Sequence, residues 1–266
     1  MDEPSEVKIV TPAMSVEPRW FEDIISARTP VLVFRDFLPP VMSQDLIRDL
    51  ELCAESIRVS RYLNATLTTL GPYLAKYVSC PGEYFRQVSD IQPVLPQSLT
   101  NMECTVYQLV MQWLQLEALN IALEPVLGEY SGSVVRFHAN GIANPLHNDN
   151  ISRDAAGTGL IVTQVTQQLS CVVCLQACTS GGALRIFNKR WGLEDEQFKV
   201  EFQLGYADEV VDGYEFCEFS PQRGDVYIFN PNFYHEIDHV VGTTRITMGF
   251  FFGLTDPKGK EAIAWS

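Results

Sequence analysis

One of the four histidines in the chain stands two residues before a carboxylate, in His147-Asn148-Asp149. Residues two apart on an extended strand point to the same face, so an imidazole and a carboxylate at this spacing can reach one ion. Pro145 disfavours a helical conformation at Asn144, and therefore an unbroken helix leading into this segment. The pattern makes His147 and Asp149 candidate metal ligands, with an ordinary surface pair as the alternative interpretation.

A third ligand has to come from elsewhere in the chain. His235 lies at the start of a predicted late strand, and His239 has the same parity on that strand, so strand geometry alone does not separate them. Two histidines and one carboxylate on one face leave three positions open on an octahedral ion. This is the ligand set of non-haem Fe(II) oxygenases.

Arg245 and Thr247 are also two apart and share a face of a predicted strand. A guanidinium with a nearby hydroxyl suits the distal carboxylate of 2-oxoglutarate, through a charge-assisted contact that can be bidentate. A structural ion pair is the alternative role for Arg245. A simple hairpin turning at Gly242 would place Arg245 opposite His239 rather than His235, whereas strands of a jelly roll can cross between sheets.

Taken in chain order, these residues resemble the signature of the Fe(II)/2-oxoglutarate-dependent oxygenases. Further segments are similar to the small-molecule branch of that family, which contains amino-acid hydroxylases and carrier-independent halogenases. They are residues 181–187 with Trp191 close behind, residues 224–230 and Trp265-Ser266. In this branch the distal histidine sits in a stretch similar to residues 235–243, which favours His235 over His239. The resemblance covers about residues 133–266.

The resemblance implies a double-stranded β-helix, or jelly roll, with iron held by His147, Asp149 and His235 and 2-oxoglutarate held by Arg245 and Thr247. The expected cofactor and co-substrates are Fe(II), 2-oxoglutarate and O2. The expected function is oxidation of a small-molecule metabolite or natural-product intermediate. Halogenases of this family replace the carboxylate with a small residue that leaves a site for halide, so the retained Asp149 favours hydroxylation.

Several alternatives stay open at this point. An epoxidase, a desaturase or a ring-forming oxidase would share the same iron site. A non-catalytic jelly-roll binding protein would keep the fold without the chemistry, and a cupin-like metalloenzyme would need no co-substrate.

Short β-rich segments separated by turn residues fill the chain after Gly132. Many short strands of this kind predict a mainly β fold of jelly-roll type with flanking helices. The expected strands are residues 133–138, 169–176, 183–187, 216–219, 225–230, 234–240 and 244–252. The longer polar segments 150–167 and 189–214 are expected to be loops over the site.

The first 130 residues show a mixed α/β pattern, which we expect to support a jelly-roll core of residues 131–254 within one domain, 1–266. A strand is predicted at residues 30–34, and a helix is predicted to follow Ser43 as its N-cap. A second helix is predicted over about residues 103–123, ending before Pro125.

The other polar candidates are expected to be structural. His138 is expected to be a hydrogen-bonded structural histidine, with a position facing the pocket as the alternative. Arg136 and Arg153 are expected to be solvated, with contact to a substrate carboxylate as the alternative. Cys171 and Cys174 lie three apart in a predicted strand and therefore on opposite faces, so we expect buried cysteines rather than a metal site.

The formal net charge is −14, and no basic footprint is visible, so we expect neither nucleic acid nor an anionic membrane as a partner. No apolar run is long enough for a transmembrane helix, and the acidic start lacks the features of a secretory signal. These patterns predict a cytoplasmic protein with a small-molecule substrate. The sequence leaves the oligomeric state open, including a homo-oligomer.

Overall fold

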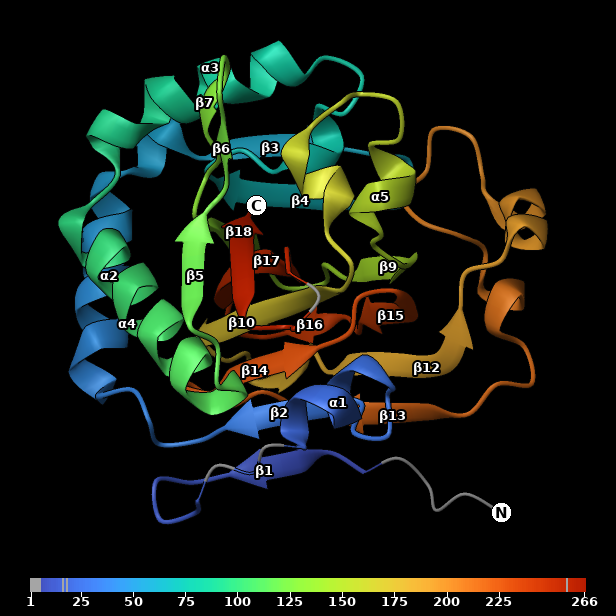
Figure 1. The fold of residues 1–266 in the computed structure, drawn as a ribbon, viewed down its shortest axis with the longest axis horizontal. Coiled ribbons are helices and arrows are strands. Elements are labelled where there is room, and N and C mark those ends of the chain that lie inside the picture. The colour runs from blue at the N-terminus through green and yellow to red at the C-terminus, as the bar shows by residue number, and fades with distance from the viewer. Residues whose placement is uncertain (1–5, 16, 18, 257) are drawn as a thin grey trace.

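Two sheets pack against each other around the predicted site in the computed structural model, which describes residues 6–15, 17, 19–256 and 258–266 (Figure 1). The larger sheet follows the order β1-β2-β14-β10-β17-β8-β4-β3, with β18 pairing β17 and β5 pairing β18. The smaller sheet follows the order β13-β12-β15-β9. Side chains from both sheets share one apolar cluster that includes Leu184, Ile186, Phe229 and Phe233. The predicted jelly roll is confirmed.

The strands of the larger sheet have the following bounds: β1 Lys8–Val10, β2 Val31–Phe34, β3 Arg58–Arg61, β4 Thr66–Leu70, β5 Ala118–Ile121, β8 Val134–His138, β10 Gln168–Gln176, β14 Val226–Phe229, β17 Arg245–Leu254 and β18 Glu261–Trp265. Those of the smaller sheet are β9 Asn144–His147, β12 Leu184–Arg190, β13 Phe216–Phe219 and β15 Phe233–Ile237. Two short pairs complete the set: β6 Leu123–Glu124 with β7 Gly128–Glu129, and β11 Ser180–Gly181 with β16 Val240–Val241.

Three helices, α1 Trp20–Ile25, α2 Pro40–Leu52 and α4 Gln97–Leu114, cover the face of the larger sheet that points away from the smaller sheet (Figure 1). Helix α3 Pro81–Ile91 and the short α5 Ile151–Asp154, which follows β9, pack instead into a second cluster with Trp265 of β18. Trp113 of α4 stacks on Phe34 of β2, with ring centroids 3.5 Å apart. Burial of a large apolar side chain stabilises a fold by roughly 1.5–3 kcal/mol, so this packing fixes the sheet that carries the site.

Strand alternation decides which residues of the larger sheet reach the site. Along β17, Ile246 and Met248 pack into the main core with the helices, whereas Arg245 and Thr247 line a cavity between the sheets. Cys171 and Cys174 on β10 are both buried, as predicted. The period of two that predicted these strands therefore also sorts core residues from cavity residues.

The two helix predictions in the first half are wrong at their ends. α4 begins at Gln97 and ends at Leu114, followed by Gln115 in a left-handed conformation, φ 55° and ψ 40°. The chain then forms β5, which pairs in parallel with β18 near the other end of the sequence, a contact that helical periodicity cannot reveal. α2 begins at Pro40, because proline suits the first helical position, so Ser43 lies inside the helix rather than at its N-cap.

The two segments predicted as loops over the site contain short helical turns. Besides α5, these are 3-10 turns at Ile161–Gln164, Leu193–Phe198 and Asp208–Val211. Among the described residues, none of the helices combines the length and apolarity needed to cross a bilayer.

Candidate metal centre

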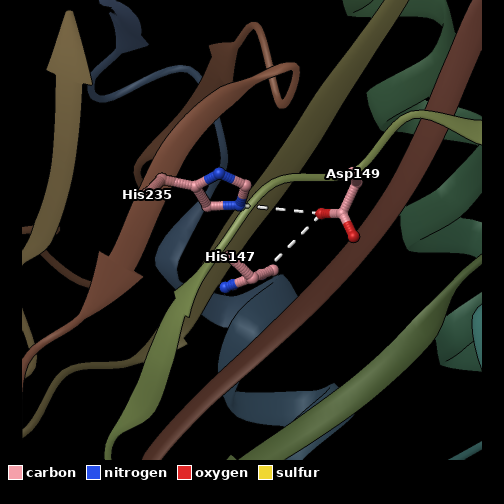
Figure 2. A group of neighbouring side chains, drawn as sticks. All are labelled: His147, Asp149 and His235. Atoms are coloured by element: carbon pink, nitrogen blue, oxygen red, sulfur yellow. Dashed lines mark ion pairs between the residues drawn. The ribbon is translucent and has the colours of Figure 1, made fainter. Parts of the chain in front are cut away.

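The side chains of His147, at the end of β9, and Asp149, two residues later, meet that of His235 on β15, far along the sequence (Figure 2). The two strands are antiparallel, and their register sets His147 directly opposite His235. The Oδ2 atom of Asp149 lies 3.8 Å from Nε2 of His147 and 3.6 Å from Nε2 of His235. One ligand atom from each residue lies within 4.8 Å of the others. Neighbouring ligands of one octahedral ion are roughly 3 Å apart, so small side-chain movements would bring these atoms onto a shared cation.

Both imidazoles are oriented by the backbone carbonyl two residues before them. Nδ1 of His147 donates to the Pro145 carbonyl at 2.7 Å, and Nδ1 of His235 donates to the Phe233 carbonyl at 2.9 Å. Because a carbonyl oxygen can only accept, Nδ1 of each ring carries a proton, so in the neutral imidazole the lone pair is on Nε2, on the side of Asp149. Burial, helped by the neighbouring His147, lowers the pKa of His235 well below its usual value. Two imidazole nitrogens and one carboxylate form a donor set that fits a divalent cation.

The route by which Asp149 reaches this cluster differs from the prediction. β9 ends at His147, so Asp149 lies beyond the strand rather than on its face. Its backbone N–H donates to the carbonyl of Pro231 at 2.8 Å, which ties the segment to the turn before β15. His239 is outside the cluster, with a side chain that is 72% exposed and next to Asp238. The predicted convergence of His147, Asp149 and His235 is therefore present, but a turn contact rather than strand parity produces it.

Arg245 and Thr247 are both buried and line the same cavity as the three clustered side chains. Arg245 lies opposite His138 of β8, and not opposite His239, because β17 and β15 belong to different sheets. Its Nη2 donates to the hydroxyl of Tyr227 at 2.9 Å, and its buried Nε has no hydrogen-bond partner among the described residues. A buried guanidinium N–H without an acceptor is costly, so this end of the cavity is suited to an anion.

Polar residues that the sequence reasoning did not single out complete the cavity. Tyr227 lies on β14 and keeps its proton at neutral pH, because burial raises the pKa of its hydroxyl to about 12. Asn144 and Ser170 also line the wall. Tyr227 lies in the segment 224–230 already noted, next to Ile228, which points to the opposite face of the strand. The alternation of side chains along this strand could therefore have placed Tyr227 in the cavity.

Three predictions about nearby side chains are wrong. His138 is buried and lines the cavity, and its Nδ1 has no hydrogen-bond partner in the described part of the chain. Arg136 is half-buried and lines the same cavity. Arg153 is half-buried rather than solvated: it donates to Asn148 and Asp154, and its guanidinium lies over the ring of Trp191 at 4.9 Å. The inward face of β8 places His138 and Arg136 in the cavity.

Comparison with known proteins assigns the family. Residues 7–266 match the family model described as carrier-protein-independent halogenase WelO5. The chain belongs to the WelO5 family. This membership confirms the predicted resemblance to the Fe(II)/2-oxoglutarate-dependent oxygenases, and the cluster of His147, Asp149 and His235 fits the Fe(II) of that family.

One curated relative of this WelO5-family chain is leucinostatins biosynthesis cluster protein S from Purpureocillium lilacinum. It is 31% identical over 119 residues, which cover 41% of this chain and 49% of that protein. The chain thus spans about half the length of the curated relative that it matches.

Solved structures share the fold at low sequence identity. An N-substituted L-amino acid dioxygenase from Burkholderia ambifaria, solved with α-ketoglutarate, has a TM-score of 0.62 and 14% identity, covering 94% of this chain and 91% of that chain. HygX from Streptomyces hygroscopicus, solved with nickel, 2-oxoglutarate and hygromycin B, has a TM-score of 0.53 and 12% identity, covering 91% and 88%. These likenesses confirm the jelly-roll fold of the WelO5-family chain.

A glycine in the loop 199–206 holds the strand that carries His147. Gly205 has φ +80°, and a Cβ there would collide with the carbonyl oxygen of Leu146 on β9. We expect Gly205→Ala to lower the free energy of unfolding by about 2–4 kcal/mol. About 1 kcal/mol of this is the cost of placing alanine at a positive φ, and the rest is the cost of the collision. Fe(II) affinity should fall as well. Chemical denaturation and Fe(II) titration measure the two effects.

Gly213 provides the matched control, because it also has φ +80° but nothing lies within 4 Å of an added Cβ. Gly213→Ala should lower the free energy of unfolding by only about 1 kcal/mol, the cost of placing alanine at a positive φ, and should leave Fe(II) affinity unchanged. Equal effects of the two substitutions would show that the contact with β9 has no role in holding the site.

The buried His138 should make the stability of the protein depend on pH. Burial, followed by the charges of Arg245 and Arg136, lowers the pKa of His138 to about 3. Between pH 6.5 and 3 the unfolded chain binds a proton at this residue that the folded chain does not, so stability falls as the pH falls. At pH 5 this residue should cost about 2 kcal/mol. The free energy of unfolding of His138→Gln should therefore fall by about 2 kcal/mol less than that of the parent between pH 7 and 5. Urea denaturation of both proteins after treatment with a chelator measures this difference. Identical pH profiles would contradict the assignment.

Proposed function

We propose that this WelO5-family chain is a hydroxylase that uses Fe(II), 2-oxoglutarate and O2 to oxidise a C–H bond of a small-molecule natural-product intermediate. The observation that carries the proposal is the carboxylate of Asp149. Its Oδ2 faces the Nε2 atoms of His147 and His235, which is the place of a third protein ligand. A cation held by all three would keep three positions for the co-substrates.

In this proposal His147, Asp149 and His235 hold the iron. Arg245 holds the distal carboxylate of 2-oxoglutarate, since its Nε lacks an acceptor among the described residues and its guanidinium is fixed by the Tyr227 hydroxyl. Thr247, buried two residues along β17, offers a hydroxyl on the same face. When bound, Fe(II) supplies the O2 chemistry that couples conversion of 2-oxoglutarate into succinate and CO2 with oxidation of the substrate.

The walls of the cavity support this assignment by excluding water from the reacting groups. Val172, Leu184, Phe229 and Ile237 line the space around the metal cluster. Apolar walls strengthen the electrostatic contacts of Asp149 and Arg245 and limit side reactions with water. Substrate orientation therefore falls to shape complementarity and to the few polar groups on the wall.

Hydroxylation is favoured over halogenation by the residue at position 149. The family is named for a carrier-protein-independent halogenase, and a halide needs the coordination position that a small residue leaves free. Here the side chain of Asp149 reaches that position, and its backbone N–H is fixed by Pro231. A carboxylate held in place would compete with chloride for the cation.

Titration with 2-oxoglutarate tests the proposal directly. Under anaerobic conditions, Fe(II) and 2-oxoglutarate added to the parent should give a weak visible charge-transfer band. Arg245→Met should weaken 2-oxoglutarate binding by about 100-fold, or ~3 kcal/mol, because it removes a buried charge-assisted contact. Arg245→Lys should recover part of the affinity. Turnover that does not require 2-oxoglutarate, or an Arg245→Met variant that binds it as the parent does, would contradict the proposal.

A further inference from the structure

The cavity holds a second guanidinium that the proposed roles do not use. Arg136 of β8 is paired in register with Thr247 of β17 and with Thr69 of β4. Its guanidinium carbon lies 5.8 Å from the ring of Tyr73, a distance that permits a cation–π contact. Within residues 6–256 and 258–266, leaving out 16 and 18, it has neither an ion pair nor a side-chain hydrogen bond. A half-buried cation without a counter-ion is expected to bind an anionic ligand.

Arg136 stands where two cavities adjoin. The cavity with the metal cluster and a neighbouring cavity are both bordered by Tyr73, Arg136, Asp149, Phe251 and Ser266. The neighbouring cavity has apolar walls, formed in part by Leu74, Ile151 and Trp265. A molecule that places a carbon near the iron and extends into the second cavity must pass Arg136.

The co-substrate does not account for this cation. In the proposed function, the iron would hold one carboxylate of 2-oxoglutarate and Arg245 the other, and Arg245 lies opposite His138 rather than opposite Arg136. Arg136 lies two residues before His138 on β8, opposite the uncharged Thr247, and unlike Arg245 and Thr247 it also borders the second cavity. A third carboxylate is needed to pair with it, and the remaining ligand of the reaction is the substrate.

We propose that Arg136 binds a carboxylate of the substrate, which makes the substrate an apolar small molecule carrying one carboxylate. This inference rests on the proposed function of the site. A single guanidinium beside a Tyr73 ring matches one planar carboxylate. A phosphate is disfavoured, because Arg136 is the one cationic side chain among the described residues that line the second cavity, and a doubly charged group would lack a second partner there.

Paired probes test the charge requirement. Decanoate, 4-phenylbutanoate and N-acetyl-L-leucine are each compared with the corresponding primary amide, which has the same shape without the charge. Binding is followed anaerobically as a change in the Fe(II)–2-oxoglutarate band, so that turnover is not required. At least one acid should bind the parent about tenfold more tightly than its amide, a difference of about 1.4 kcal/mol.

Three variants identify the residue responsible. Arg136→Met should abolish the preference for the acid while leaving the titration with 2-oxoglutarate unchanged, and Arg136→Lys should keep part of the preference. Arg61→Met removes an exposed positive charge from β3 of the same sheet and should behave as the parent. Retained 2-oxoglutarate binding also shows that each variant is folded.

The outcomes separate this inference from the proposed function. If no acid binds the parent more tightly than its amide, or if Arg136→Met keeps the preference, the substrate assignment is overturned and the iron site stands. If Arg136→Met instead weakens 2-oxoglutarate binding, the cation serves the co-substrate and the inference is wrong. Absence of the band in the parent overturns both.

Discussion

His235→Ala is expected to abolish Fe(II)-dependent conversion of 2-oxoglutarate into succinate, with a loss of at least about 1,000-fold. Loss of a residue that merely orients a metal ligand costs about 10- to 100-fold, so loss of a ligand costs more. The chain would keep only His147 and Asp149 as donors in this cluster. Fe(II) titration and succinate assays of the variant and the parent measure the effect.

His239→Ala is the control, because the sequence pattern offered His239 as the alternative third ligand, with the same strand parity as His235. Its side chain is exposed and lies next to Asp238 rather than Asp149, so we expect parent-like Fe(II) affinity and activity. Thermal denaturation of both variants shows that each is folded. If His239→Ala fails to bind Fe(II) while His235→Ala still binds it, then His239 and not His235 is the metal ligand.

The strands of the jelly roll were predictable because their residues alternate with a period of two and end at glycine-containing turns. The same alternation predicted that Arg245 and Thr247 share a face, and both line the cavity. Register was not predictable in this way. The pairing of His147 with His235 joins strands far apart in the sequence, and the hydrogen bond from Asp149 to Pro231 depends on that pairing.

The errors have the same physical origin. Residues 118–121 continue an apolar helical pattern, yet they form β5 because β18 pairs with them. His138 and Arg136 were expected to be satisfied or solvated, as most polar residues are, but the inward face of β8 places both in the cavity. Local patterns therefore identified the chemistry of the site, whereas its full set of polar residues required the tertiary arrangement.

Asp149→Gly is expected to change the chemistry of the site rather than only to reduce it. The substitution removes the carboxylate that faces both Nε2 atoms and leaves room for a halide on the cation. Hydroxylation should fall by at least about 100-fold, as expected for loss of a metal ligand. Formation of the Fe(II)–2-oxoglutarate band should become dependent on chloride, because chloride replaces the missing anionic ligand.

The chloride dependence can be measured before the substrate is known. The band is titrated in sulfate buffer with and without added chloride, for the parent, Asp149→Gly and Asp149→Glu. The parent and Asp149→Glu keep a carboxylate at this position and should be insensitive to chloride, whereas Asp149→Gly should require it. The same response in all three proteins would mean that Asp149 does not occupy the halide position. In that case the residue that separates this chain from a halogenase would have to be sought elsewhere in the cavity.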